Sequence, residues 1–169
     1  GFVFGEVGNL FNKFYTQHLP FALTEAQKRV IREIRKDMGS GKQMNRLLQG
    51  DVGSGKTIVA LMLMLLAADN GFQSVLMAPT EVLAMQHYAS IGELVKDLDI
   101  KVSFLSGSVT GSTRAELLQS LKTGSTNILL GTHAVIEEGV EFSNLGLAIT
   151  DEQHRFGVAQ RAQMWSKST

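Results

Sequence analysis

The sequence has no cysteine and only two prolines among its 169 residues. The lack of cysteine excludes disulfides, thiolate catalysis and thiolate metal sites, and it is usual for a reducing compartment. Sixteen basic residues balance sixteen acidic ones, so any contact with a polyanion must be local. The longest apolar run, Ile58 to Ala68, is too short to cross a bilayer, and no signal peptide is apparent. We therefore expect a soluble, cytoplasmic protein with no membrane partner.

The apolar segments alternate between strand and helix patterns. Short apolar strands are expected at 74–78, 101–105, 127–130 and 145–150, and helices at 81–95 and about 112–121. This order predicts an α/β fold with a mainly parallel sheet that is covered on both faces. A hydrophobic content of 44% in a chain of this length suits one well-buried domain. The loop-bearing strand ends should share one edge, where ligands bind in such sheets.

A glycine-rich segment, GDVGSGKT, follows a short apolar run and precedes the long one. It matches GxxxxGK[ST] in the expected strand–loop–helix context. Its glycines allow a nest of amide groups that can surround phosphates, and the following helix dipole adds to the attraction. A plain glycine-rich turn is the alternative, which the spacing disfavours. The predicted ligand is ATP or another nucleoside triphosphate with Mg²⁺, bound by Gly50, Asp51, Val52, Gly53, Ser54, Gly55, Lys56 and Thr57.

Individual residues in this loop have different expected roles. Lys56 supplies a mobile positive charge for the β- and γ-phosphates, and the Thr57 hydroxyl is placed to ligate Mg²⁺. An acidic pair, Asp151 and Glu152, follows the last expected strand. Asp151 can hold Mg²⁺ through water, and Glu152 can orient and deprotonate an attacking water. Such a pair could instead cap a helix or face solvent, but beside a phosphate loop it favours a hydrolase over a kinase.

The N-terminal part is expected to be helical. Apolar residues near helical spacing predict an amphipathic helix over 9–19. Thr24 to Gln27 form a capping box, which starts a second helix with an apolar face of Ala26, Val30, Ile31, Ile34 and Met38. Gln27 has two possible roles, because its amide could close the helix end or pair with adenine. The four histidines, His18, His87, His133 and His154, lack metal-ligand spacing and are expected at the surface or behind other functional groups.

Four motifs together resemble the first motor domain of the RecG family of superfamily 2 DNA helicases. They are GDVGSGKT, APTEVLAMQH of 78–87, GTHAVI of 131–136 and DEQHRFGV of 151–158, and LPFALTEAQ of 19–27 resembles the family's adenine-reading segment. The resemblance covers about residues 19–161. It implies a RecA-like P-loop NTPase domain, a three-layer sandwich that uses ATP and Mg²⁺. The transcription-repair coupling factor is similar, but usually differs at the positions of Ser54 and Gln153.

The resemblance also implies roles for particular residues. Phe21 and Gln27 would contact the adenine, and Asp151 and Glu152 would hold magnesium and activate water. His154 would couple the nucleotide site to the DNA side. Short loops of Gly, Ser and Thr offer amide and hydroxyl donors to DNA phosphates with little base specificity, although simple turns explain these loops equally well. The DNA contacts implied are Pro79, Thr80, Gly107, Ser108, Thr132 and His133.

The resemblance finally implies partners in the same protein. A second RecA-like lobe with an arginine finger and a wedge domain for branched DNA would complete the motor. We expect residues 1–19 to be a linker helix from a preceding domain, or an artificial remnant, and residues 20–169 to be the ATP-binding lobe. Alone, this fragment should bind ATP weakly and hydrolyse it barely. The competing hypothesis is a nucleotide-binding switch that docks a partner without moving along DNA.

Overall fold

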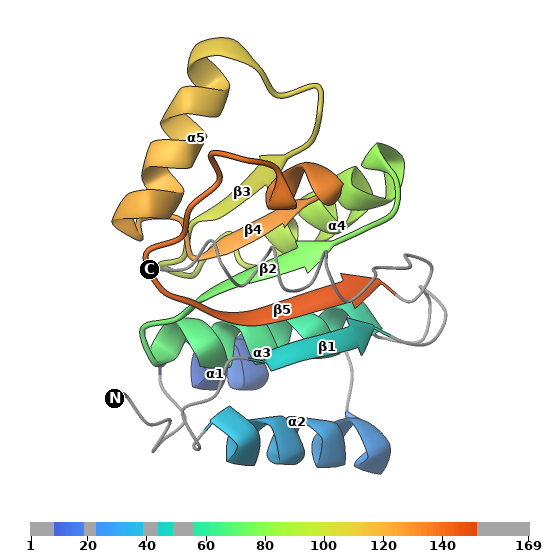
Figure 1. The fold of residues 1–169 in the computed structure, drawn as a ribbon. Helices are drawn as coiled ribbons and strands as arrows, with labels where there is room; N and C mark the ends of the chain where they lie inside the picture. The colour runs from blue at the N-terminus through green and yellow to red at the C-terminus, as the bar shows by residue number, and fades with distance from the viewer. Residues whose placement is uncertain (1–8, 19–22, 39–43, 49–55, 152–169) are drawn as a thin grey trace.

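Five parallel strands form the central layer of the part of the chain that the structure describes (Figure 1). The structure is a computed structural model, and it describes residues 9–18, 23–38, 44–48 and 56–151. The strand order is β1-β5-β2-β4-β3, and every adjacent pair is parallel. This arrangement confirms the predicted α/β fold. The strands are β1 (Met44–Leu48), β2 (Gln73–Met77), β3 (Val102–Leu105), β4 (Ile128–Gly131) and β5 (Leu145–Asp151).

Helices cover both faces of this sheet. α3 (Lys56–Asp69) and α4 (Glu81–Leu94) share one apolar cluster with one face, and α1 (Asn9–Lys13) and α2 (Glu25–Met38) pack on α3 from outside. α5 (Gly111–Thr123) and the 3₁₀-helix η3 (His133–Ile136) share a second cluster with the other face. The three-layer sandwich is therefore confirmed. No described helix is both long and apolar enough to cross a membrane.

α3 is the central helix of the first layer. Its residues from Ala60 to Ala67 are all buried, since the sheet covers one side and α1 and α2 cover the other. A helix that is apolar on all sides must be enclosed in this way. The carboxylate of Asp69, at its last position, accepts hydrogen bonds from the amides of Leu10 (2.9 Å) and Phe11 (3.0 Å). These bonds attach α1 to the end of α3.

The N-terminal helices differ from the prediction in detail. α1 continues into a π-helical turn, η1 (Phe14–His18), so the expected helix is present through residue 18, and residue 19 lies outside the described residues. In α2, Ile31 and Ile34 are buried as expected, but Ala26 and Val30 are exposed. The apolar face is narrower than predicted because α2 contacts the rest of the protein along one row of side chains. The side chain of Met38 lies outside the described residues.

A β-bulge in β5 decides which way its side chains point. Gln73 pairs with Leu145 and Ser74 with Leu147, so Gly146 is an extra residue in the ladder. A bulge shifts the alternation of side chains by one position. Leu145 therefore belongs to the cluster under α5, whereas Leu147 and Ile149 belong to the cluster under α3 and α4. Asp151 continues the second alternation, which directs its side chain toward α3 and α4.

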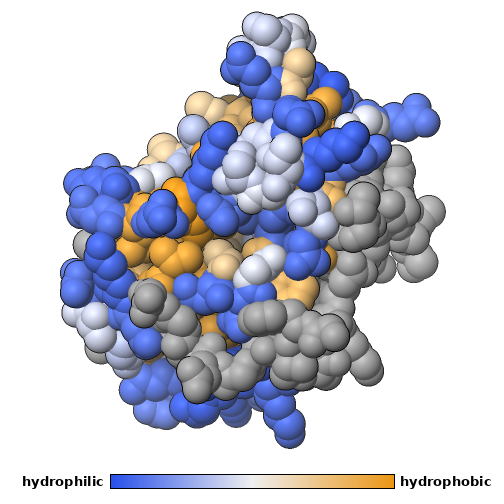
Figure 2. Space-filling view, turned by 90° about the vertical axis from the view of Figure 1, so that its left-hand side faces the viewer, coloured by the Kyte–Doolittle hydropathy of each residue, from blue (hydrophilic) through white to orange (hydrophobic). Residues whose placement is uncertain are grey.

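The strands begin at one end of the sheet, and the described candidate residues lie at the other end. Figure 2 shows the side that lies to the left in Figure 1, where the strands begin. Hydrophilic residues cover most of the described surface on that side, and an apolar area lies among them. The described candidate residues Lys56, Thr80, Thr132 and Asp151 lie at the opposite end, after or at the ends of strands. The expectation that the loop-bearing strand ends share one edge is met for the described strands.

Candidate functional site

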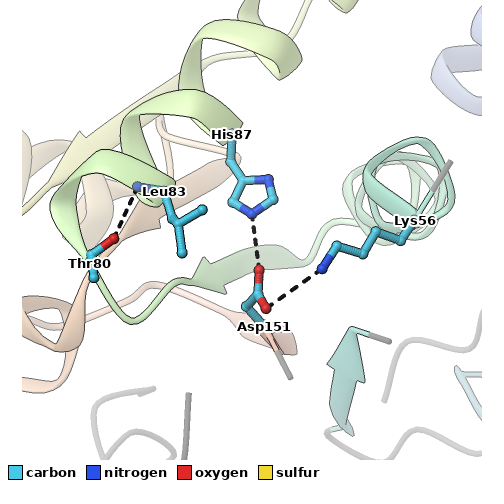
Figure 3. A network of polar contacts seen from close by, with 5 residues as sticks. All are labelled: Lys56, Thr80, Leu83, His87 and Asp151. Carbon is cyan, nitrogen blue, oxygen red and sulfur yellow. Dashed lines mark hydrogen bonds and ion pairs between the residues drawn. The ribbon is translucent and has the colours of Figure 1, made fainter. Parts of the chain in front are cut away.

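A buried ion pair joins the start of α3 to the end of β5. The Nζ atom of Lys56 lies 3.7 Å from Oδ1 of Asp151 (Figure 3). Lys56 is 5% exposed and Asp151 is 2% exposed. Taking two such charges out of water is costly, and their mutual attraction offsets this cost only when they lie close together. The two residues that the sequence assigned to phosphate and metal therefore converge at one edge of the sheet.

His87 completes this buried cluster from α4. Its Nε2 atom lies 3.4 Å from Oδ2 of Asp151, and the residue is 5% exposed. A carboxylate can only accept a hydrogen bond, so the contact requires a proton on Nε2. The two oxygens of Asp151 thus contact groups from two different helices, as Figure 3 shows.

Sequence analysis left His87 either at the surface or behind other functional groups, and the structure places it behind Asp151. The sequence grouped this residue with histidines that lack metal-ligand spacing, and it indicated nothing more specific. A signal was present in the sequence, because Ala84, His87 and Ile91 recur at helical spacing. In the structure all three are buried. A histidine within an otherwise apolar stripe needs a polar partner. The sequence does not identify that partner, because Asp151 belongs to a distant strand.

The described donor set fits a magnesium-bound phosphate group. A lysine at a helix N-terminus is suited to an anion, and a carboxylate oxygen is a ligand that Mg²⁺ prefers. Thr57 follows Lys56 in the first turn of α3 and is partly exposed, so its hydroxyl belongs to the same corner of the sheet. No group of three or more metal-ligating side chains was found in the described ranges, and Mg²⁺ typically keeps several waters with only one or two carboxylates.

A second group of polar side chains lies where α4 begins. The Thr80 hydroxyl accepts a hydrogen bond from the amide of Leu83 (3.2 Å) and caps α4. The Ser106 hydroxyl donates to Oε1 of Glu81 (2.7 Å), and the Ser108 hydroxyl donates to the same oxygen. Both bonds favour the ionised carboxyl and lower the pKa of Glu81 below its usual value of 4.5. The bond from Ser108 has the larger effect, and the bond from Ser106 the smaller one. Glu81 thus joins the loop after β3 to the start of α4.

The remaining candidates for DNA contact follow the ends of β2, β4 and β3. The backbone amide of Ala78 donates to the carbonyl of Gly131 (2.9 Å), and the backbone amide of Thr132 donates to the carbonyl of Leu105 (3.2 Å). The ends of β2, β4 and β3 are therefore adjacent. Thr132 is 7% exposed, and its hydroxyl accepts from the amide of Ala134 (3.5 Å). Gly107, Ser108 and His133 are exposed, and Pro79 is partly exposed.

The capping box at the start of α2 is present as predicted. Oε1 of Gln27 accepts from the amide of Thr24 (2.9 Å), and the Thr24 hydroxyl accepts from the amide of Gln27 (3.1 Å). The adenine role of Gln27 stays a prediction. The other predicted site residues lie outside the described part of the chain: Phe21, Gly50, Asp51, Val52, Gly53, Ser54, Gly55, Glu152 and His154.

Comparisons with known proteins agree on one family. A model of the DEAD/DEAH box helicase family matches residues 24–168. The chain is 54% identical over 153 residues to the ATP-dependent DNA helicase RecG of Bacillus subtilis. The aligned residues cover 90% of this chain and 22% of that protein. It is 50% identical over 153 residues to the RecG of Thermotoga maritima, covering 90% of this chain and 20% of that protein. The predicted resemblance to RecG is thereby confirmed.

Solved structures give the same picture. A structure of RecG bound to a three-way DNA junction matches with a TM-score of 0.75 and 34% identity, covering 97% of this chain and 26% of that one. The helicase MrfA matches with a TM-score of 0.61 and 13% identity, covering 96% of this chain and 32% of that one, which supports the fold alone. The chain spans about a fifth of the length of the curated relatives described above.

Proposed function

Because this chain belongs to the DEAD/DEAH box helicase family, we propose that it is the ATP-binding motor lobe of a DNA helicase. The motor would couple ATP hydrolysis to the remodelling of forked and junction DNA in recombination and repair. The contact between Lys56 and Asp151 is the observation that carries this proposal. It places a phosphate-binding cation and a metal-binding carboxylate together, as an ATPase requires. The similarity to RecG supports DNA as the substrate.

The predicted site residues would have different roles at the nucleotide. Lys56 would contact the β- and γ-phosphates, and Thr57 and Asp151 would hold Mg²⁺. When bound, Mg²⁺ offsets the negative charge that develops on the phosphate oxygens. Glu152 would activate the attacking water, and Phe21 and Gln27 would contact the adenine. His154 would couple the site to DNA. The amides of residues 50–55 would surround the phosphates.

The DNA strand would lie along the adjacent ends of β2, β4 and β3. Thr80 and Thr132 already cap helices through their hydroxyls, so their contribution would come mainly from backbone amides. Exposed groups of Gly107, Ser108 and His133, together with Pro79, would add contacts to phosphates. Amide and hydroxyl donors position a nucleic-acid backbone without reading its bases, so little sequence preference is expected.

The complete motor would need parts beyond this lobe. We propose that a second RecA-like lobe and a wedge domain belong to the same protein, because the chain corresponds to about a fifth of its RecG relatives. Residues 1–19 would connect to the wedge. An arginine finger from the second lobe typically raises the rate of hydrolysis by about 10³ to 10⁵. The lobe by itself should therefore bind Mg-ATP weakly and hydrolyse it barely, with or without DNA.

Calorimetric titration with Mg-ATP tests the nucleotide site. The unchanged chain should bind, and Lys56→Ala should remove most of the affinity because the phosphate charge is no longer balanced. Lys96→Ala is the matched control, since Lys96 is an exposed lysine that pairs with Glu93 at 2.7 Å on α4, and its loss should leave binding unchanged. Equal affinity of the Lys56→Ala variant and the unchanged chain would refute the assignment.

A further inference from the structure

His87 is a buried polar side chain for which the proposed function names no role. It lies in the second turn of α4, facing inward with Ala84 and Ile91. Its Nε2 atom contacts Oδ2 of Asp151 at 3.4 Å. A buried histidine beside a buried carboxylate is a more specific arrangement than packing alone requires, because an apolar side chain could fill the same space without a desolvation cost.

The position of the contact suggests its purpose. Oδ1 of Asp151 faces Lys56 on α3, whereas Oδ2 faces His87 on α4. Lys56 would also serve the phosphates, so it is shared between two anionic partners. His87 would then be a partner that holds the carboxylate in one orientation while nucleotide binds. Rotation of the carboxylate would break this contact.

We propose that His87 is a positioning residue for Asp151, which it holds in the orientation that accepts Mg²⁺. This inference rests on the proposed function, since it concerns the same nucleotide site. Groups that hydrogen-bond to a metal ligand orient it, and their loss typically lowers metal affinity by about 10- to 100-fold. His87 would not touch the nucleotide or the metal, and it would act only through Asp151.

The helix that carries His87 also reaches the proposed DNA edge. α4 is capped by Thr80, and Glu81 in its first turn holds the loop after β3. Figure 3 shows Thr80 at the start of the helix that carries His87, with Asp151 opposite His87. The carboxylate of the proposed nucleotide site and the start of the proposed DNA edge are therefore both in contact with α4.

Two substitutions of His87, each of which keeps a nitrogen near one of the two ring nitrogens, can distinguish a positioning role of the side chain from a role in packing alone. The amide nitrogen of a glutamine reaches about where Nε2 lies, whereas that of an asparagine reaches about where Nδ1 lies. Because Nε2 makes the contact with Asp151, His87→Gln should retain it and His87→Asn should not. Gln86→Ala, at the exposed neighbouring position, is the control for changes in α4 itself.

The measurement is ATP affinity of this chain as a function of Mg²⁺ concentration, with an EDTA sample as the metal-free baseline. Mg²⁺ should raise the ATP affinity above its metal-free value. The Mg²⁺ concentration at which half of this increase is reached should be about 10- to 100-fold higher in His87→Ala and His87→Asn than in the unchanged chain. It should stay near the unchanged value in His87→Gln and Gln86→Ala, and metal-free ATP affinity should be equal in all of them. Circular dichroism would verify folding, and if His87→Ala unfolds, the Gln and Asn variants decide.

The outcomes separate the inference from the proposed function. Equal Mg²⁺ dependence in the unchanged chain and in His87→Asn would overturn the inference alone, as would equal impairment of the Gln and Asn variants. If the unchanged chain binds no ATP at any Mg²⁺ concentration, the proposed function fails and the inference fails with it.

Discussion

Lys56 and Asp151 lie far apart in the chain, yet Nζ of the first is 3.7 Å from Oδ1 of the second. Both side chains are almost completely buried, so each is a counter-ion of the other. Removing one partner would leave a buried charge without this counter-ion, which is destabilising. The energetic effect of breaking the pair can therefore be measured without any ligand.

Asp151→Ala should destabilise the ligand-free protein. It removes the carboxylate beside the buried Lys56 cation, and breaking a buried pair in this way costs about 3–5 kcal/mol. Denaturant unfolding would measure the change. Adding Lys56→Ala should recover part of the loss, because no lone buried cation then remains.

The control is Glu141→Ala, which breaks an exposed pair with Lys122 at 3.9 Å. Exposed pairs contribute about 0–1 kcal/mol. If Asp151→Ala were no more harmful than this control, the buried ion pair would have no energetic importance.

Gln27→Glu should separate the two roles proposed for Gln27. A carboxylate can still accept the hydrogen bond from the amide of Thr24, and negative charge is favourable in a first helical turn. The substitution removes the amide donor that adenine would need. We therefore expect unchanged thermal stability with weaker ATP binding.

Thr24→Ala is the companion variant, because loss of a cap hydroxyl costs about 1 kcal/mol. Thermal unfolding and ATP titration of both variants would be compared. Full ATP affinity in Gln27→Glu would show that Gln27 only caps the helix.

Gly131→Ala should disrupt the end of β4. A Cβ at this position would overlap the carbonyl oxygen of Leu105 and lie 2.8 Å from Cγ1 of Val135. Overpacking of this kind costs about 1–3 kcal/mol or more, and here a backbone atom must move. Thermal unfolding should show a lower melting temperature.

Gly92→Ala provides the opposite expectation for the same chemical change. Apart from the adjoining residues and the backbone of α4 itself, no atom lies within 4 Å of where a Cβ at Gly92 would be, and alanine is favoured over glycine in a helix by about 1 kcal/mol. This variant should be more stable than the unchanged protein. Similar effects of the two substitutions would contradict the close approach at Gly131.

The carboxyl of Glu81 should titrate below its usual pKa of 4.5, because hydroxyl groups of Ser108 and Ser106 favour its ionised form. A lowered folded-state pKa means that the contact stabilises the loop above the usual pKa and is lost as the pH falls through the folded value. NMR titration of the side-chain carboxyl would measure it. Replacing both serines with alanine should move the midpoint upward, and an unchanged midpoint would show that the hydroxyls do not hold the carboxylate.

The local features of the fold were predictable from sequence because short-range physics controls them. The apolar run from Ile58 to Ala68 identified α3 within its bounds Lys56–Asp69, and the spacing of Thr24 and Gln27 identified the capping box. Strand bounds were correct to within about two residues. The exposure of Ala26 and Val30 was not predictable, because it depends on how α2 meets α3.

The sequence by itself determined the succession of strands and helices, the lysine at the start of α3 and the carboxylate at the end of β5. Backbone periodicity and glycine spacing are sufficient for these features. Only the tertiary structure decided that β5 lies between β1 and β2, and that the bulge at Gly146 turns Asp151 toward α3 and α4. It alone revealed His87 as a partner of Asp151. Side-chain direction depends on strand register, and contacts between separate helices depend on packing, so neither can be read from a local pattern.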